Sequence, residues 1–200
     1  MRKQHAGSIG TAASHNLYTI FSYRMKRFLT IAIMALTLAT AATAQDADSK
    51  YATELLKPGT EAPDFTIENS TAKYNGTSLL SMRGQYVVLD FWASWCPDCR
   101  KDIGEMRSMY GDFASDSVAF VGISFDKDET AWRKCVNDST MTWMQHSELK
   151  PWKETRISQD YHIKWIPSMY LIGPDGKVVL ATVEIKKLRK ALEAISTAKK

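Results

Sequence analysis

Cys96 and Cys99, separated by two residues, are the side chains of this sequence whose type and spacing could do chemistry. A Cys-x-x-Cys pair can cycle between a dithiol and a disulfide when one of its thiols ionises readily. A nearly continuous apolar run, 87–92, precedes the pair, and apolar residues recur at helical spacing over 103–113. The pattern predicts a buried strand, a short loop, and a helix that begins at the pair.

Pro97 suits the first turn of that helix, where its missing N–H breaks no hydrogen bond. Cys96 then lies at the helix N-terminus, where unpaired N–H groups and the helix dipole favour a thiolate. Cys99 lies one turn further along and is expected to be the less exposed partner. We therefore predict a redox site in which Cys96 attacks a disulfide and Cys99 resolves the product.

Two other uses of the pair explain it less well. A zinc site needs four ligands, and the three Cys and four His provide no second pair at ligand spacing, so we expect no metal. A purely structural disulfide would close a loop of two intervening residues and would contribute little chain entropy.

The stretches FWASWCPDC at 91–99 and WIPS at 165–168 resemble the thioredoxin-fold family, and specifically its exported TlpA/ResA-like branch of thiol-disulfide oxidoreductases. PGTEAPDF at 58–65 and LIGPDGK at 171–177 extend the resemblance from about Pro58 to Ile195. It implies an α/β fold, a thioredoxin-like three-layer sandwich. In that fold a mixed central sheet of parallel strands and a final antiparallel hairpin is flanked by helices, with a short N-terminal hairpin extension.

The resemblance also assigns roles around the pair. Trp95, Ile166 and Pro167 are expected to line the groove that receives a partner's chain, with Pro97 and Asp98 beside it. In the family the peptide bond before this second proline is cis and faces the cysteines. The reaction is thiol-disulfide exchange on disulfide-bearing exported proteins, and it requires no cofactor other than the redox-active cysteine pair.

Asp90 is the one charged residue in the apolar run, six positions before Cys96. The resemblance implies a carboxyl that lies beneath the cysteines and moves protons to and from the resolving thiol. Burial raises the pKa of a carboxyl toward neutrality, which suits a general acid/base. An aspartate satisfied by backbone groups is the alternative. Asp102, after Cys99, is either a modulator of the site or an exposed acid that complements the helix dipole.

Asp98 bears on the direction of the reaction, because most of the family has proline directly before the second cysteine. A negative charge beside the Cys96 thiolate keeps its pKa from falling far, whereas a strong oxidant needs a strongly depressed thiol pKa. We therefore predict a protein-disulfide reductase, with a potential of roughly −200 mV or below rather than ~−120 mV. In an oxidising compartment it would be re-reduced by a membrane thiol donor.

The chain divides into four predicted segments. Residues 1–24 read as a non-structural upstream segment, and 25–44 has the basic, apolar and small-residue order of a signal peptide, with cleavage after Ala44. A retained membrane anchor is the alternative. Residues 45–57 read as a polar linker and 58–200 as the thioredoxin-like domain. The protein is thus expected to be exported to the periplasm or cell envelope.

The formal charge of +4 is concentrated in residues 1–44, which hold five Lys/Arg and no acid. The remainder has 21 basic and 22 acidic residues and carries no nucleic-acid footprint. Membrane contact is expected only through the signal or a retained anchor.

Two other functions remain in competition. The opening at 58–65 also resembles peroxiredoxins, but a peroxide site needs Thr or Ser three positions before a single attacking Cys, and position 93 is Ala. A non-catalytic binding module would use the thiols only as ligands. Cys135 lies on the apolar stripe of a predicted helix, 129–137, and core packing explains it better than a redox role.

Overall fold

The computed structural model describes residues 46–70 and 73–197. The predicted upstream segment 1–24 and signal peptide 25–44, with its cleavage site, lie outside these residues. Within the described part of the chain, none of the helices combines the length and apolarity needed to span a membrane.

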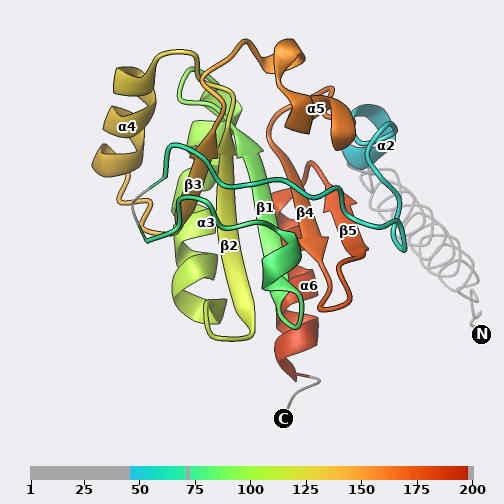
Figure 1. The fold of residues 1–200 in the computed structure, drawn as a ribbon. Coiled ribbons are helices and arrows are strands. Elements are labelled where there is room, and N and C mark those ends of the chain that lie inside the picture. The colour runs from blue at the N-terminus through green and yellow to red at the C-terminus, as the bar shows by residue number, and fades with distance from the viewer. Residues whose placement is uncertain (1–45, 71–72, 198–200) are drawn as a thin grey trace, which may run out of the picture. The chain divides into compact units, whose positions relative to one another are not determined.

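A five-stranded sheet in the order β3-β2-β1-β4-β5 forms the centre of the fold (Figure 1). The central strand β1 (Tyr86–Trp92) runs parallel to β2 (Val118–Ser124), which in turn runs parallel to β3 (Met144–Ser147). On its other side β1 is antiparallel to β4 (Ser168–Ile172), and β4 is antiparallel to β5 (Val178–Thr182). The predicted mixed sheet with a C-terminal antiparallel hairpin is confirmed.

Helices and short 3-10 turns surround the sheet, and two of the helices, α3 and α6, pack against each other. The elements are α2 (Asp48–Tyr51), η1 (Leu80–Met82), α3 (Pro97–Phe113), α4 (Glu129–Asp138), η2 (Trp152–Glu154), α5 (Arg156–Asp160) and α6 (Ile185–Thr197). The apolar stripe of α3, made by Ile103, Met106 and Met109, is buried against the sheet.

After residue 57 the chain crosses the sheet from the β5 side to the β3 side (Figure 1). Beside β5, the Gly59 N–H donates to the Val178 carbonyl at 2.8 Å. Beside β3, the Glu68 N–H donates to His146 Nδ1 at 2.9 Å.

The crossing segment also pairs with the chain that follows it. Thr66 and Ser78 form an antiparallel bridge, and the Ile67 N–H donates to the Thr77 carbonyl at 2.8 Å. This pairing is the N-terminal hairpin extension that the sequence predicts.

Residues 45–57, interpreted from the sequence as a polar linker, differ from that expectation. The structure has α2 in this segment and buries Leu55. The Asp48 carboxylate accepts hydrogen bonds from the Val183 N–H and from Lys187 Nζ, each at 2.7 Å. Asp48 in the expected linker therefore binds the chain just before α6 and the Lys187 side chain of that helix. From residue 46 the segment is part of the packed domain.

Gly104 offers a test of helix α3. It is exposed in the helix interior, and a Cβ there would meet nothing within 4 Å. Gly104→Ala should raise the free energy of unfolding by roughly 0.5–1 kcal/mol, because glycine costs that much in a helix. Gly176, with φ +81° in the turn before β5, is the matched control. Gly176→Ala should lower it by about 1 kcal/mol or more, because a side chain disfavours that backbone. Urea denaturation measures both, and shifts of equal sign would contradict the prediction.

Candidate active site

Cys96 is the N-cap residue of α3, where the chain leaves β1 through a short loop. Its backbone is extended (φ −86°, ψ 111°), and Pro97 is the first helical residue. The Cys99 N–H donates to Cys96 Sγ at 3.1 Å. The sulfur therefore occupies the place that a capping oxygen usually takes, next to the positive end of the helix dipole.

The two cysteines are joined by a disulfide, with their Cα atoms 5.3 Å apart. Both are nearly buried, Cys96 at 5% exposure and Cys99 at 3%. The predicted difference in exposure is therefore small in the disulfide form, because the bond holds both sulfurs at one place. What distinguishes the two is their position, at the helix end and one turn inside it.

The loop before β4 lies against Cys96. The Ile166–Pro167 peptide bond is cis, and the Ile166 carbonyl oxygen is 3.9 Å from Cys96 Sγ. Both residues of this bond are buried, whereas Trp95 is 55% exposed. Pro97 is also exposed, on the first turn of α3. The structure thus brings the predicted groove residues to the disulfide.

Further aromatic side chains lie beside these residues and were not among the candidates from the sequence. Trp165, 39% exposed, stacks on Tyr51 of α2 with ring centroids 4.2 Å apart. Trp152 lies 6.5 Å from Trp95 and stacks on Phe125 at 5.4 Å. The position of Trp165 directly before Ile166 could have marked it as a site residue. Its stacking on Tyr51 could not be predicted, because the two residues are far apart in the sequence and form no local pattern.

Asp90 lies in the middle of β1, opposite Gly122 of β2 and Met169 of β4. Burial raises the pKa of its carboxyl to about 7, and the negative charge of Asp102 contributes to the rise. No hydrogen bond from a described residue is among the causes, so the alternative of a carboxyl satisfied by backbone groups has no support here. A carboxyl of this pKa can both accept and release a proton near neutral pH.

Asp102 and Asp98 occupy different environments on α3. Asp102 is half-buried, and its pKa is raised by burial and then by the charges of Asp98 and Glu105. Asp98 is exposed, and its Oδ1 accepts a hydrogen bond from Lys101 Nζ at 2.7 Å. Solvent and Lys101 screen the Asp98 charge, so it opposes a Cys96 thiolate less than the sequence suggests.

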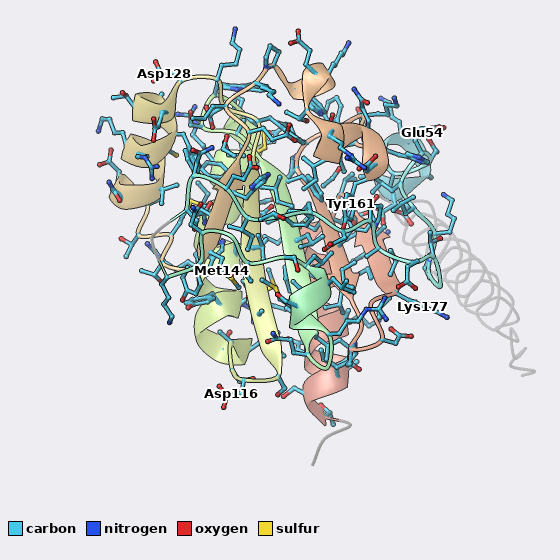
Figure 2. The ribbon with its side chains drawn as sticks, in the orientation of Figure 1. Glu54, Asp116, Asp128, Met144, Tyr161 and Lys177 are labelled. Carbon is cyan, nitrogen blue, oxygen red and sulfur yellow. A yellow bond between two sulfur atoms is a disulfide. The ribbon has the colours of Figure 1, made fainter. Side chains whose placement is uncertain are left out.

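Asp126 is a buried acid that the sequence analysis missed. It follows β2 and accepts hydrogen bonds from Ser94 in the loop before Cys96. Asp116 and Asp128, labelled in Figure 2, lie at opposite ends of β2, and Asp128 is at the end where β1 and β2 finish. The carboxyl ends of parallel strands converge there, which is the signal that could have identified Asp126.

Two other groups of titratable residues lie apart from the disulfide. The carboxylates of Asp46, Asp48 and Glu184 come close enough to share a cation, but Lys187 Nζ contacts them at 2.5, 2.7 and 3.1 Å. These carboxylates therefore anchor the segment 46–51 through Lys187.

Cys135 is half-buried outside any disulfide, and burial raises the pKa of its thiol, which makes it less reactive.

The model of the AhpC/TSA family matches residues 58–181. The chain belongs to this family. This chain is 27% identical over 126 residues to thiol-disulfide oxidoreductase ResA of Bacillus subtilis. The match covers 63% of this chain and 67% of ResA. The chain is 29% identical over 157 residues to sporulation thiol-disulfide oxidoreductase A of that organism, over 76% of this chain and 87% of the relative.

Among solved structures, the thioredoxin domain of a thiol-disulfide oxidoreductase from Bacteroides vulgatus matches this AhpC/TSA protein with a TM-score of 0.63. The match has 28% identity and covers 70% of this chain and 98% of that domain. The predicted thioredoxin-like fold and the predicted class, thiol-disulfide oxidoreductase, are confirmed.

The buried Asp90 should make the stability of this AhpC/TSA protein depend on pH. Its pKa is about 7 in the fold against an ordinary 3.8, so the folded state binds more protons between these values. The free energy of unfolding should therefore fall as pH rises through this range, by on the order of 4 kcal/mol in total. Asp90→Asn should remove most of this slope. Urea denaturation from pH 4 to 8 measures it, and equal slopes in both proteins would contradict the prediction.

Proposed function

We propose that the protein reduces disulfides in other proteins, with Cys96 as the attacking thiol and Cys99 as the resolving thiol. One observation carries the proposal: Cys96 Sγ caps α3 and accepts the Cys99 N–H, beside the cis Ile166–Pro167 bond. A sulfur in this position is stabilised as a thiolate, which is the form that attacks disulfides.

The proposed reaction begins from the reduced pair. The Cys96 thiolate attacks one sulfur of the partner's disulfide, which forms a mixed disulfide and expels the other partner sulfur as a thiolate that takes up a proton. Cys99 then loses its proton and attacks Cys96 Sγ, which releases the second partner thiolate. Two electrons have passed to the partner, and the Cys96–Cys99 disulfide remains. The dithiol supplies the electrons, so the reaction as proposed uses no bound cofactor.

Asp90 accepts the proton from Cys99 in this proposal. It lies on β1, close enough to Asp102 of α3 for that charge to affect its pKa. Its pKa of about 7 allows the ionised form to act as a base near neutral pH. Asp102 modulates the step, because its charge contributes to the raised pKa of Asp90.

The partner's chain is proposed to lie along the exposed Trp95, next to the buried Ile166–Pro167 bond, with Pro97 and Asp98 at the rim. Trp95 offers exposed apolar surface next to the disulfide. The order of residues in 25–44 supports export, so the partners would be disulfide-bearing exported proteins. Outside the cytoplasm a reductant lacks a soluble thiol pool, and a membrane thiol donor would restore the dithiol.

Equilibration with glutathione, combined with reduction of insulin disulfides, tests the proposal. We expect insulin reduction that requires Cys96, and a midpoint of roughly −200 mV or below. A midpoint near ~−120 mV would identify an oxidant and overturn the direction. Rapid peroxide consumption abolished by Cys96→Ser would favour the peroxidase, and stoichiometric bound metal without insulin reduction would favour the binding module.

A further inference from the structure

The carboxylate of Asp126 makes contacts that the reaction above does not use. The residue is 2% exposed. Its Oδ2 accepts from the Ser94 N–H at 2.9 Å and from Ser124 Oγ at 2.7 Å, and its Oδ1 accepts from Ser94 Oγ at 2.6 Å. Both oxygens accept and neither donates, which is the pattern of an ionised carboxylate.

The position of this carboxylate is fixed by the sheet. The Asp126 N–H donates to Ser124 Oγ at 3.0 Å, and Ser147 Oγ of β3 donates to the Asp126 carbonyl at 3.4 Å. Ser94 lies two residues before Cys96, in the loop between β1 and α3. The hydrogen bonds to Ser94 therefore attach the loop that carries the reactive cysteine to a rigid part of the fold.

The charge of Asp126 has no neutralising partner, since it forms no ion pair with a described residue. The other acids near the pair differ in this respect. Asp98 is paired with Lys101 at the surface, and Asp102 is only half-buried. Burial raises the pKa of Asp90 to about 7, so this carboxyl is partly protonated at neutral pH. Asp126 is thus the acid beside the active-site loop that combines burial with full hydrogen bonding of its ionised form.

We propose that Asp126 is a positioning residue for Cys96 and that its buried charge biases the cysteine pair toward the disulfide. A negative charge near the Cys96 thiolate disfavours the reduced form, and a pair whose reduced form is less stable is the stronger reductant. This inference rests on the proposed function, because it assigns to Asp126 the role that the sequence suggested for the exposed Asp98.

Neutral replacements test the charge. Asp126→Asn keeps the shape and an oxygen acceptor for the Ser94 N–H, and Asp126→Ser is a second neutral variant should the first fold poorly. Each should shift the equilibrium with glutathione about threefold to tenfold toward the dithiol. The matched control is Asp128→Asn. Asp128 is an exposed acid two residues further on that caps α4 through the Thr130 and Ala131 N–H groups. The Asp128→Asn substitution should change the equilibrium with glutathione less than twofold.

Ser94→Ala separates the anchor from the charge. It removes one hydrogen bond and keeps the carboxylate, so it should slow the Cys96 attack on a disulfide while changing the equilibrium less than twofold. A purely structural role would lower the stability of the Asp126 variants and leave their equilibrium with glutathione at the wild-type value, and that result would overturn the inference. If the wild-type pair fails to exchange with glutathione or insulin, the proposed function itself fails, which is a separate outcome.

Discussion

Cys99→Ser should convert the protein into a covalent trap for its partners. With the resolving sulfur replaced by oxygen, the mixed disulfide between Cys96 and the partner cannot be released by the second step. We expect partner proteins to accumulate as reductant-sensitive adducts when the variant is expressed as the full 200-residue chain. The adducts are separated on non-reducing gels and identified by mass spectrometry, which also identifies the substrate proteins.

Cys96→Ser is the matched control, because it alters the neighbouring sulfur of the same pair. It should trap almost nothing and should lose essentially all disulfide reduction. Cys135→Ser, which changes the half-buried thiol on α4, should leave both trapping and reduction at the wild-type level. Equal trapping by the Cys96 and Cys99 variants would show that the attacking and resolving roles are misassigned.

Asp90→Asn should slow the resolving step by on the order of 10²-fold, the lower range for loss of a general base. The amide cannot accept the Cys99 proton, whereas the attack by Cys96 needs no such proton acceptor. In the wild type the resolving rate should rise as Asp90 ionises, with a midpoint near the pKa of about 7. The variant should lose this rise.

Stopped-flow measurement of mixed-disulfide formation and decay separates the two steps. Asp98→Asn is the control, because it removes an exposed acid from α3, the helix that carries Cys99, and should alter resolution little. A wild-type resolving rate that stays constant from pH 6 to 8, or an Asn variant that resolves as fast as the wild type, would exclude Asp90 as the base.

Much of the fold follows from patterns that are local in the sequence. The apolar run of β1 and the helical spacing of α3 fix the strand, loop and helix around the cysteines. Strand β3 (Met144–Ser147) was not predicted, because it is short and polar. Its burial comes from pairing with β2 and from Glu68 on the crossing segment, and both are distant in sequence. Helix α2 was missed for a similar reason, since its anchor is the chain just before α6 and Lys187 of that helix.

In the candidate site, too, some residues can be recognised from local sequence patterns, whereas others depend on contacts between distant parts of the chain. The spacing of the cysteines makes Cys96 and Cys99 candidates from the sequence, and the single charge in an apolar strand, with the family resemblance, adds Asp90. Asp126 could not be recognised, because its function depends on hydrogen bonds to Ser94, which is 32 residues away. The orientation of Asp98 into solvent depends on side-chain packing, which residue spacing alone does not reveal.

The segment that crosses the sheet has a consequence for solubility. A sheet that ends in unpaired N–H and C=O groups can add strands from other molecules, and such open edges promote aggregation. Here one stretch of chain pairs with the β5 backbone at Val178 through Gly59 and with the β3 backbone at Ser147 through the Glu68 carbonyl, so it covers part of each edge. Removing residues 46–70 would expose both edges at once, and the remaining chain would be prone to intermolecular strand addition before its redox chemistry could be measured.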